Sequence, residues 1–204
     1  MAVLLETMDD DELAARLAHD LDGTFEALVL THQDRLYSVA VRLLGDARDA
    51  EEVAQDAFVR AYQALATWDA ARIREVRLRA WLASIVVNLA RNRRRNAADL
   101  RPPAALERLL EPGLQPAAGP RQAPEAAALH ADAAREWTER LGRCPATLRA
   151  AVVLRHVDGL SYEEIAEALG RPVGTVKAQV HRGLANLRAQ LEAERGAERP
   201  ELTT

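Results

Sequence analysis

Apolar residues recur every three or four positions over most of the first hundred residues, which is the spacing of one face of an α-helix. One such row predicts a helix over 25–44 that ends at Gly45, because glycine adopts the left-handed conformation that closes helices. Two adjacent rows follow Asp46, a candidate N-cap, and predict a second helix with one buried face. Shorter patterns predict two further helices, over 9–21 and about 78–95. A basic connection is predicted over 72–77. We therefore expect an all-α protein.

The same spacing returns in the last third of the chain and predicts two helices, at about 126–141 and over 147–157. Ser161 and Glu164 then form a Ser-x-x-Glu capping box, which starts a short helix that Gly170 can end. Pro172 is well placed to begin a further helix, whose predicted buried row is Val173, Val176, Val180, Leu184 and Leu187. A short helix, a tight turn and a second helix predict a helix-turn-helix.

The helical spacing fails between these two groups, over residues 97–129, where six of the nine prolines fall. Proline removes a backbone donor and prevents a helix from continuing, so this stretch is predicted to be a flexible, Pro-rich linker. The linker divides the chain into two small helical domains and a terminal tail, over 1–96, 130–195 and 196–204.

Composition excludes several classes of protein. Of 204 residues, 49% are hydrophobic and 28% are charged, so the chain should fold. The single cysteine, Cys144, excludes an internal disulfide, and no zinc-ligand spacing occurs, so we expect no metal, no cofactor and a reducing cytosol. No apolar stretch reaches the roughly 18 residues that a spanning helix needs, and the acidic N-terminus is unlike a secretory signal. We therefore expect a cytoplasmic protein without membrane insertion.

The net charge of −4 hides a polarised distribution of charge. Residues 1–71 carry 15 acidic and 5 basic side chains, whereas residues 72–95 carry 8 basic side chains and one acidic side chain. An acidic body followed by a basic band indicates two partners of opposite character, one electropositive and one resembling nucleic acid. Ordinary solvated helix faces are the alternative explanation.

Polar residues on the second helix of the helix-turn-helix are the first candidates for DNA contacts. Gly174 and Thr175 fall in its first turn, where free backbone N–H groups and the helix dipole suit a phosphate. The side chains expected to face a major groove are those of Lys177, Gln179, His181 and Arg182. Gly183 lies inside the same helix and is expected to cost about 1 kcal/mol relative to alanine. A helical hairpin with a polar outer face is the alternative.

The basic band supplies a second candidate nucleic-acid surface on the helix at 78–95. An aromatic ring and an amide, those of Trp81 and Asn88, could receive an unstacked base, which suits a single strand better than a duplex. The arginines expected to bind phosphates are Arg91, Arg93, Arg94 and Arg95. For Trp81 alone, burial in the core is the competing role.

Together these motifs resemble the extracytoplasmic-function (ECF) sigma factors of bacterial RNA polymerase, and the resemblance covers nearly the whole chain. Residues 49–62 look like the region 2 helix that binds the polymerase clamp, and 79–91 are similar to the segment that opens and reads the minus-10 element. Residues 159–177 look like the region 4 helix-turn-helix for the minus-35 element. The resemblance implies a promoter-recognition subunit with no catalytic residues, whose catalysis belongs to the polymerase.

The resemblance also implies particular contacts. Those with core RNA polymerase would come from Glu51, Glu52, Gln55 and Asp56. Asn88 matches a position at the pocket for a flipped minus-10 base. The major-groove readers of the family are matched by Lys177, Gln179, His181 and Arg182. The implied partners are core polymerase, promoter DNA that is single-stranded at minus-10 and duplex at minus-35, and an anti-sigma factor, which is common in the family.

Two other functions remain open on the sequence. A free-standing repressor or activator would use only the helix-turn-helix and would not need the acidic residues of 51–56. An enzyme is suggested only by the run Asp9-Asp10-Asp11-Glu12, which could hold magnesium. Acidic runs at helix starts usually interact with the helix dipole, and no nucleophile or phosphate-binding loop accompanies this one.

Overall fold

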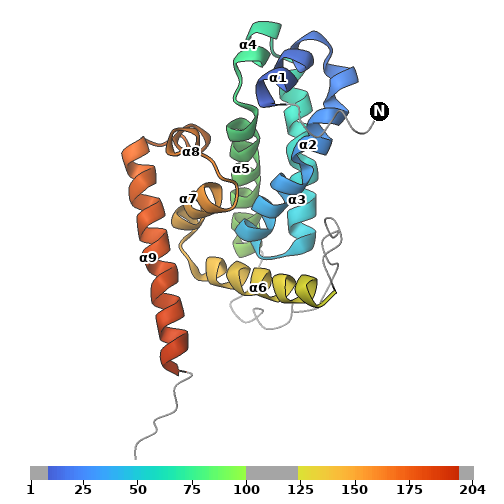
Figure 1. The fold of residues 1–204 in the computed structure, drawn as a ribbon. Helices are drawn as coiled ribbons and strands as arrows, with labels where there is room; N and C mark the ends of the chain where they lie inside the picture. The colour runs from blue at the N-terminus through green and yellow to red at the C-terminus, as the bar shows by residue number, and fades with distance from the viewer. Residues whose placement is uncertain (1–8, 100–123, 198–204) are drawn as a thin grey trace, which may run out of the picture.

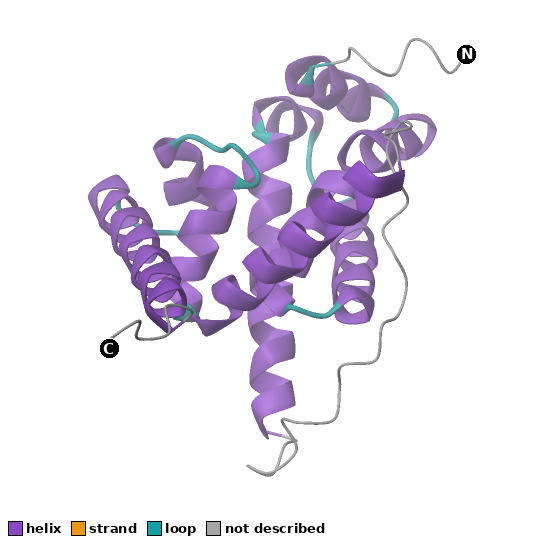
Figure 2. Cartoon of the chain, turned by 60° about the horizontal axis from the view of Figure 1, so that its bottom comes forward, coloured by secondary structure: helices purple, strands orange, loops and turns teal. Residues whose placement is uncertain are grey.

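The computed structural model describes residues 9–99 and 124–197, and the regular elements within these ranges are all helices (Figures 1 and 2). The prediction of an all-α chain is therefore confirmed. The N-terminal group comprises α1 (Asp10–His19), α2 (Leu21–Leu44), α3 (Ala47–Leu65), α4 (Ala70–Glu75) and α5 (Leu78–Asp99). The C-terminal group comprises α6 (Pro124–Arg143), α7 (Ala146–His156), α8 (Tyr162–Leu169) and α9 (Val173–Ala197). Within these two ranges, no helix combines the length and the apolar character that crossing a membrane requires.

Aspartate side chains start four of the N-terminal helices. Each accepts a hydrogen bond from the backbone N–H three residues further on, and the four are Asp9, Asp20, Asp46 and Asp69. These bonds satisfy donors that a helix start leaves unpaired. The run of acids at residues 9–12 thus forms the start of α1, with Asp9 as its cap. Part of the acidic excess of this half is explained by capping.

Several helix boundaries differ from the predicted ones. The predicted break after residue 21 is wrong, because Asp20 both ends α1 and caps α2. Residues 72–77 were predicted to be a connection, but most of them belong to α4. Helix α5 reaches Asp99 and α6 begins at Pro124, a residue suited to a first helical turn, so both helices enter the stretch predicted to be a linker. The rest of that linker, and the tail beyond residue 197, lie outside the described residues.

The predicted helix-turn-helix is formed by α8 and α9. Glu164 N donates to Ser161 Oγ at 3.1 Å and Ser161 N donates to Glu164 Oε2 at 2.7 Å, which completes the capping box. Gly170 ends α8 with a φ of 61°. A Cβ at Gly183 would lie 2.4 Å from Cγ2 of Val152, so this glycine allows α9 to approach α7 closely. Leu184, predicted to be buried, is instead 41% exposed.

The two groups of helices pack against each other. Helix α5 contacts α2 and α3 of its own group and α8 of the other, while α2 contacts α6 and α7 (Figure 1). Buried leucine, valine and alanine side chains from both groups form one continuous apolar cluster. The helix that carries the basic band therefore lies beside the helix-turn-helix.

Candidate protein and nucleic-acid interfaces

The outer face of α3 carries the acidic residues that the sequence assigned to a protein partner. Glu51, Gln55 and Asp56 are exposed and Glu52 is half-exposed, while the opposite face of the helix is buried in the core. Val59 lies one turn beyond Gln55 and is 55% exposed. Sequence reasoning missed Val59, although its spacing of four residues from Gln55 on a polar face was the available signal. The outer face therefore combines negative charge with one apolar residue.

One predicted DNA contact lies with these acidic residues. Arg93 of α5 places its Nη2 2.6 Å from Asp49 Oδ1 and its Nη1 2.5 Å from Glu52 Oε2. The hydrogen bond from Arg93 lowers the pKa of Glu52, and the hydrogen bonds to Asp49 and Glu52 raise the pKa of Arg93. The structure thus brings Arg93 to the edge of the α3 face and separates its charge from the rest of the basic band.

The remaining basic residues of α5 differ in their surroundings. Asn88, Arg91 and Arg95 present their side chains to solvent. Arg94 Nη1 donates to the Leu43 carbonyl oxygen at 3.1 Å, and burial lowers the pKa of its guanidinium. Arg94 is exposed as well, but it is engaged by the Leu43 carbonyl group, and Arg93 is paired with acidic residues. Of the arginines predicted to bind phosphates, Arg91 and Arg95 are therefore the two without a hydrogen bond or ion pair among the described residues.

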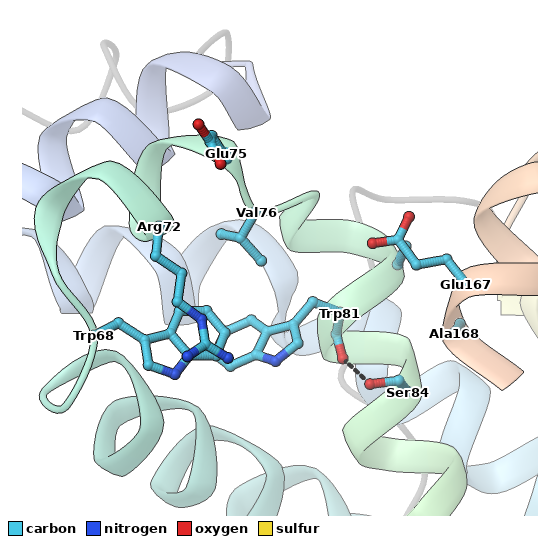
Figure 3. A pocket seen from close by; sticks show the side chains of 9 residues that line it. Trp68, Arg72, Glu75, Val76, Trp81, Ser84, Glu167 and Ala168 are labelled. Atoms are coloured by element: carbon cyan, nitrogen blue, oxygen red, sulfur yellow. Dashed lines mark hydrogen bonds between the residues drawn. The ribbon is translucent and has the colours of Figure 1, made fainter. Parts of the chain in front are cut away.

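A hollow of about 310 Å³ lies beside Trp81 (Figure 3). The half-buried Trp81 ring lies against Trp68, with ring centroids 4.9 Å apart and planes tilted by 48°. The Arg72 guanidinium lies 4.1 Å from the centroid of the Trp68 ring. Ser84, one turn along α5 from Trp81, also lines the hollow. Trp81 is therefore partly packed against Trp68 and partly exposed as a wall of the hollow. This position is compatible with both roles that the sequence left open, burial in the core and contact with an unstacked base.

The sequence analysis did not single out Trp68 or Arg72 as site residues. The available signal was a tryptophan just after an amphipathic helix and just before the basic band. Two residues of the hollow come from the C-terminal group, because Glu167 and Ala168 of α8 also line it. Glu167 Oε2 lies 3.7 Å from Arg77 Nη1. The aromatic hollow is thus bordered by the first helix of the helix-turn-helix.

The start of α9 carries most of the predicted duplex contacts on its exposed side. The exposed residues there are Gly174, Thr175, Lys177, His181 and Arg182. Lys177 Nζ lies 5.4 Å from the Tyr162 ring centroid, and the Arg155 guanidinium lies 4.9 Å from the same ring. The backbone N–H of Thr175 donates to the Pro172 carbonyl oxygen at 2.9 Å, so it is not one of the free first-turn donors that were predicted.

Gln179 does not face outward. It is only 8% exposed, and its Oε1 has no hydrogen-bond partner among the described residues. It lies three residues after Val176 and directly before Val180, both buried, so helical geometry places it at the edge of the apolar stripe. The prediction that Gln179 projects toward a major groove is not supported by this position.

Comparisons with known proteins agree with this arrangement. Residues 28–99 match the family model of sigma-70 region 2, and residues 135–187 match that of sigma-70 region 4. The chain is 32% identical over 183 residues to the RNA polymerase sigma-H factor of Pseudomonas aeruginosa, covering 88% of this chain and 92% of the relative. It is 34% identical over 171 residues to the ECF RNA polymerase sigma factor SigW of Bacillus subtilis, covering 82% and 88%.

Solved structures show the same fold. The structure of CnrH in complex with the cytosolic domain of CnrY matches with a TM-score of 0.63 and 28% identity, over 90% of this chain and 97% of that one. The sigma factor RpoE of Bartonella quintana, solved with the anti-sigma factor NepR, matches in fold with a TM-score of 0.58 and 23% identity, over 82% and 96%.

Both halves of the molecule thus define a sigma-70-type transcription factor. The chain belongs to the ECF family of RNA polymerase sigma factors. Its function is promoter recognition in transcription initiation, and it is not an enzyme. The sequence prediction of this function is confirmed, against the alternatives of a free-standing regulator and an enzyme.

Proposed function

We propose that the chain docks on core RNA polymerase through the outer face of α3. The residues that would make the contact are Glu51, Glu52, Gln55 and Asp56, with Val59 as an apolar addition. Support comes from the exposure of this face, while the other side of α3 is committed to the core. Negative charge would favour encounter with an electropositive partner, and the apolar residue would add area that binding removes from water.

The minus-10 element would be bound along one side of α5. An unstacked base would enter the hollow beside Trp68 and Trp81, where stacking on an aromatic ring contributes roughly 1–3 kcal/mol per base. Asn88 lies one turn beyond Ser84 and would recognise a base edge, while Arg91 and Arg95 would hold the phosphates of the single strand. Arg93 and Arg94, which are engaged within the chain, would contribute less.

The minus-35 element would be bound as duplex by the start of α9. The exposure of Gly174, Lys177, His181 and Arg182 supports this assignment. The helix start would approach a phosphate, and the longer side chains would reach base edges in the major groove. Gln179 would support the helix from its buried position and would not read a base.

The domain limits and partners follow from the same proposal. Residues 1–96 would be the unit for polymerase and minus-10 binding, 97–129 the linker, 130–195 the minus-35 unit and 196–204 a tail. The chain would act in the cytoplasm, where the polymerase acts. An anti-sigma factor is a further expected partner, since CnrH and RpoE, two structural relatives, were solved with CnrY and an anti-sigma factor respectively.

The observation that carries the proposal is the conjunction, on neighbouring helices, of an exposed acidic face and an aromatic hollow beside exposed arginines. The test is transcription by purified core polymerase and this chain on fragments of the source genome, with the RNA starts mapped. We expect starts that share two upstream elements and disappear when the chain is omitted. A chain that never joins core polymerase, or directs no RNA synthesis, would refute the assignment.

A further inference from the structure

A second pocket, of about 130 Å³, is lined by the C-terminal half of α5 and the start of α7. Three arginine side chains contribute to it, those of Arg91 and Arg94 on α5 and of Arg149 on α7. None of the three forms an ion pair within residues 9–99 and 124–197, and no acidic residue is among those that line the pocket. The pocket therefore gathers positive charge that no nearby carboxylate offsets.

Arg149 is the most unusual of the three, because its side chain is buried and the residue is only 3% exposed. Its Nη1 donates to the Leu43 carbonyl oxygen at 2.7 Å, and its Nη2 donates to the carbonyl oxygens of Gly142 and Cys144 at 3.1 and 3.0 Å. Its Nε is buried and has no hydrogen-bond partner among the described residues. Taking a charged group out of water costs free energy unless an opposite charge compensates. An anion in the pocket would supply that charge.

The start of α7 adds backbone donors to the same pocket. Its N-cap is Pro145, and no side chain caps the helix. The backbone N–H groups of Ala146 and Thr147 have no acceptor in the part of the chain that the structure describes, and both residues line the pocket. Such free N–H groups, together with the helix dipole, attract anions. The helix start and the buried Arg149 are thus two independent observations that indicate the same kind of ligand.

The arrangement of the donors favours a phosphate group. Guanidinium groups from two helices and a helix start line one space, which suits an anion whose oxygens point in several directions better than a planar carboxylate. Arg94 donates within the described chain through Nη1 alone. The pocket has room for several water molecules, and hence for a phosphate. Apolar walls, which include Val87 and Ala150, exclude solvent and strengthen the attraction.

We propose that this pocket binds a phosphate group through Arg91, Arg94, Arg149 and the start of α7. The phosphate can come from two sources, a free phosphate compound or the backbone of a nucleic-acid strand. The second source rests on the proposed function, because it assumes that α5 binds promoter DNA. The first source rests only on the contacts within the chain.

Titration of the full chain with inorganic phosphate at constant ionic strength, followed by phosphorus NMR, tests the pocket. Arg91→Gln should leave the fold intact, because Arg91 is exposed, and should weaken phosphate binding about tenfold, because a charge-assisted hydrogen bond is lost. Arg74→Gln is the matched control, since Arg74 is an exposed arginine of the same basic band that does not line the pocket. Equal losses for the two variants, or no saturable binding by the unsubstituted chain, would overturn the pocket.

A second variant places a negative charge in the pocket without weakening the fold. Thr147 is exposed in the first turn of α7, where a carboxylate interacts favourably with the helix dipole. Thr147→Glu should therefore unfold at the same urea concentration or a higher one, while its carboxylate occupies the donors and weakens phosphate binding at least tenfold. Ala189→Glu adds the same charge at an exposed position of α9 outside the pocket and should bind phosphate normally. Unchanged phosphate binding by Thr147→Glu would overturn the proposal.

The same two variants distinguish the sources of the phosphate when they are titrated with a fluorescein-labelled, mixed-sequence 30-nucleotide single strand. A strand phosphate in the pocket predicts that Thr147→Glu weakens strand binding more than Ala189→Glu does, and that inorganic phosphate competes with the strand. Equal strand binding by the two variants, with phosphate binding lost in Thr147→Glu alone, would assign the pocket to a free phosphate compound. Phosphate binding by a chain that directs no transcription with core polymerase would support the pocket and refute the proposed function instead.

Discussion

The acidic face of α3 and the basic side of α5 lie on neighbouring helices of the same group, yet they differ in their exposure to solvent and in their contacts within the chain. The α3 face is open to solvent over Glu51, Gln55 and Asp56. The α5 side is bordered by α8, which lines the same hollow as Trp81, and one of its arginines, Arg93, is paired with acidic residues of α3. In this structure the surface for a protein partner is therefore accessible, whereas the surface for DNA is accessible only in part.

This difference gives separate tests for the two surfaces. Substitutions on the exposed face of α3 should act on polymerase binding, whereas substitutions on α5 should act on DNA binding. Variants that change one surface alone should therefore separate the two kinds of binding.

The largest expected effect concerns pH and the buried side of α2. His32 is buried beside Arg35 and Arg79, and its Nε2 lies 3.5 Å from Asp10 Oδ1 without a hydrogen bond. Burial, with smaller contributions from Arg35 and Arg79, lowers the pKa of His32 from 6.5 to about 4. The unfolded chain therefore takes up a proton between pH 6.5 and 4 that the folded chain does not. The stability present above pH 6.5 should fall by up to about 3 kcal/mol as the pH approaches 4.

Urea unfolding of the chain and of His32→Gln, at pH 7 and at pH 4.5, measures this contribution. Carboxylates such as Asp10 also titrate in this range, but they are common to both proteins and cancel in the difference. His19→Gln is the control, because His19 is exposed on α1. His32→Gln should lose less stability than the unsubstituted chain on acidification. Identical losses would show that His32 is not the group responsible.

The next effect concerns the packing of α9 against α7 within the C-terminal group of helices. Gly183→Ala places a methyl group against Val152 and close to the Leu148 carbonyl oxygen, so overpacking should reduce the free energy of unfolding by about 1–3 kcal/mol. Gly196→Ala, on the same helix with no atom near its added Cβ, should be neutral or slightly stabilising. Chemical denaturation followed by circular dichroism compares them. Equal stability of both variants would show that Val152 moves aside.

Gly183 also shows what the sequence could not supply. The helix around it was predictable, and by helix propensity alone a glycine at this position only lowers the stability of the helix. Its role depends on the distance between α7 and α9, which is a property of the packed structure. By contrast, the capping box at Ser161 and the left-handed Gly170 were predictable, because each acts within a few residues of the chain.

The candidate sites divide in the same way. Periodicity and charge sufficed for the exposed positions of α3 and for most of those of α9. They failed for Gln179, where burial is decided by one step around the helix, and for Arg93, whose partners come from another helix. The Trp68 contact with Trp81 spans a turn and the short helix α4, which the sequence analysis interpreted as a connection. Long-range pairing is what the sequence alone did not supply.

A charge reversal on α3 tests whether this surface binds the polymerase. Asp56 is exposed, whereas Glu52 is already tied to Arg93, so Asp56→Lys changes the outer face with less disturbance inside the chain. We expect binding to core polymerase to weaken about tenfold. Fluorescence anisotropy with purified core measures the affinity, and Asp34→Lys is the control. Unchanged affinity of Asp56→Lys would remove this face from the interface.

The smallest effect compares two arginines of α5 that are two residues apart. Arg91 is exposed, while Arg93 is held by Asp49 and Glu52. Arg91→Ala should weaken binding of a fluorescein-labelled, mixed-sequence 30-nucleotide single strand about threefold and reduce the slope of log affinity against log salt by about 0.7, because one phosphate contact is lost. Arg93→Ala should change neither, since its charge is already neutralised within the chain. Equal losses for the two variants would mean that the pairing of Arg93 yields to DNA, and that the acidic face of α3 and the basic side of α5 are coupled.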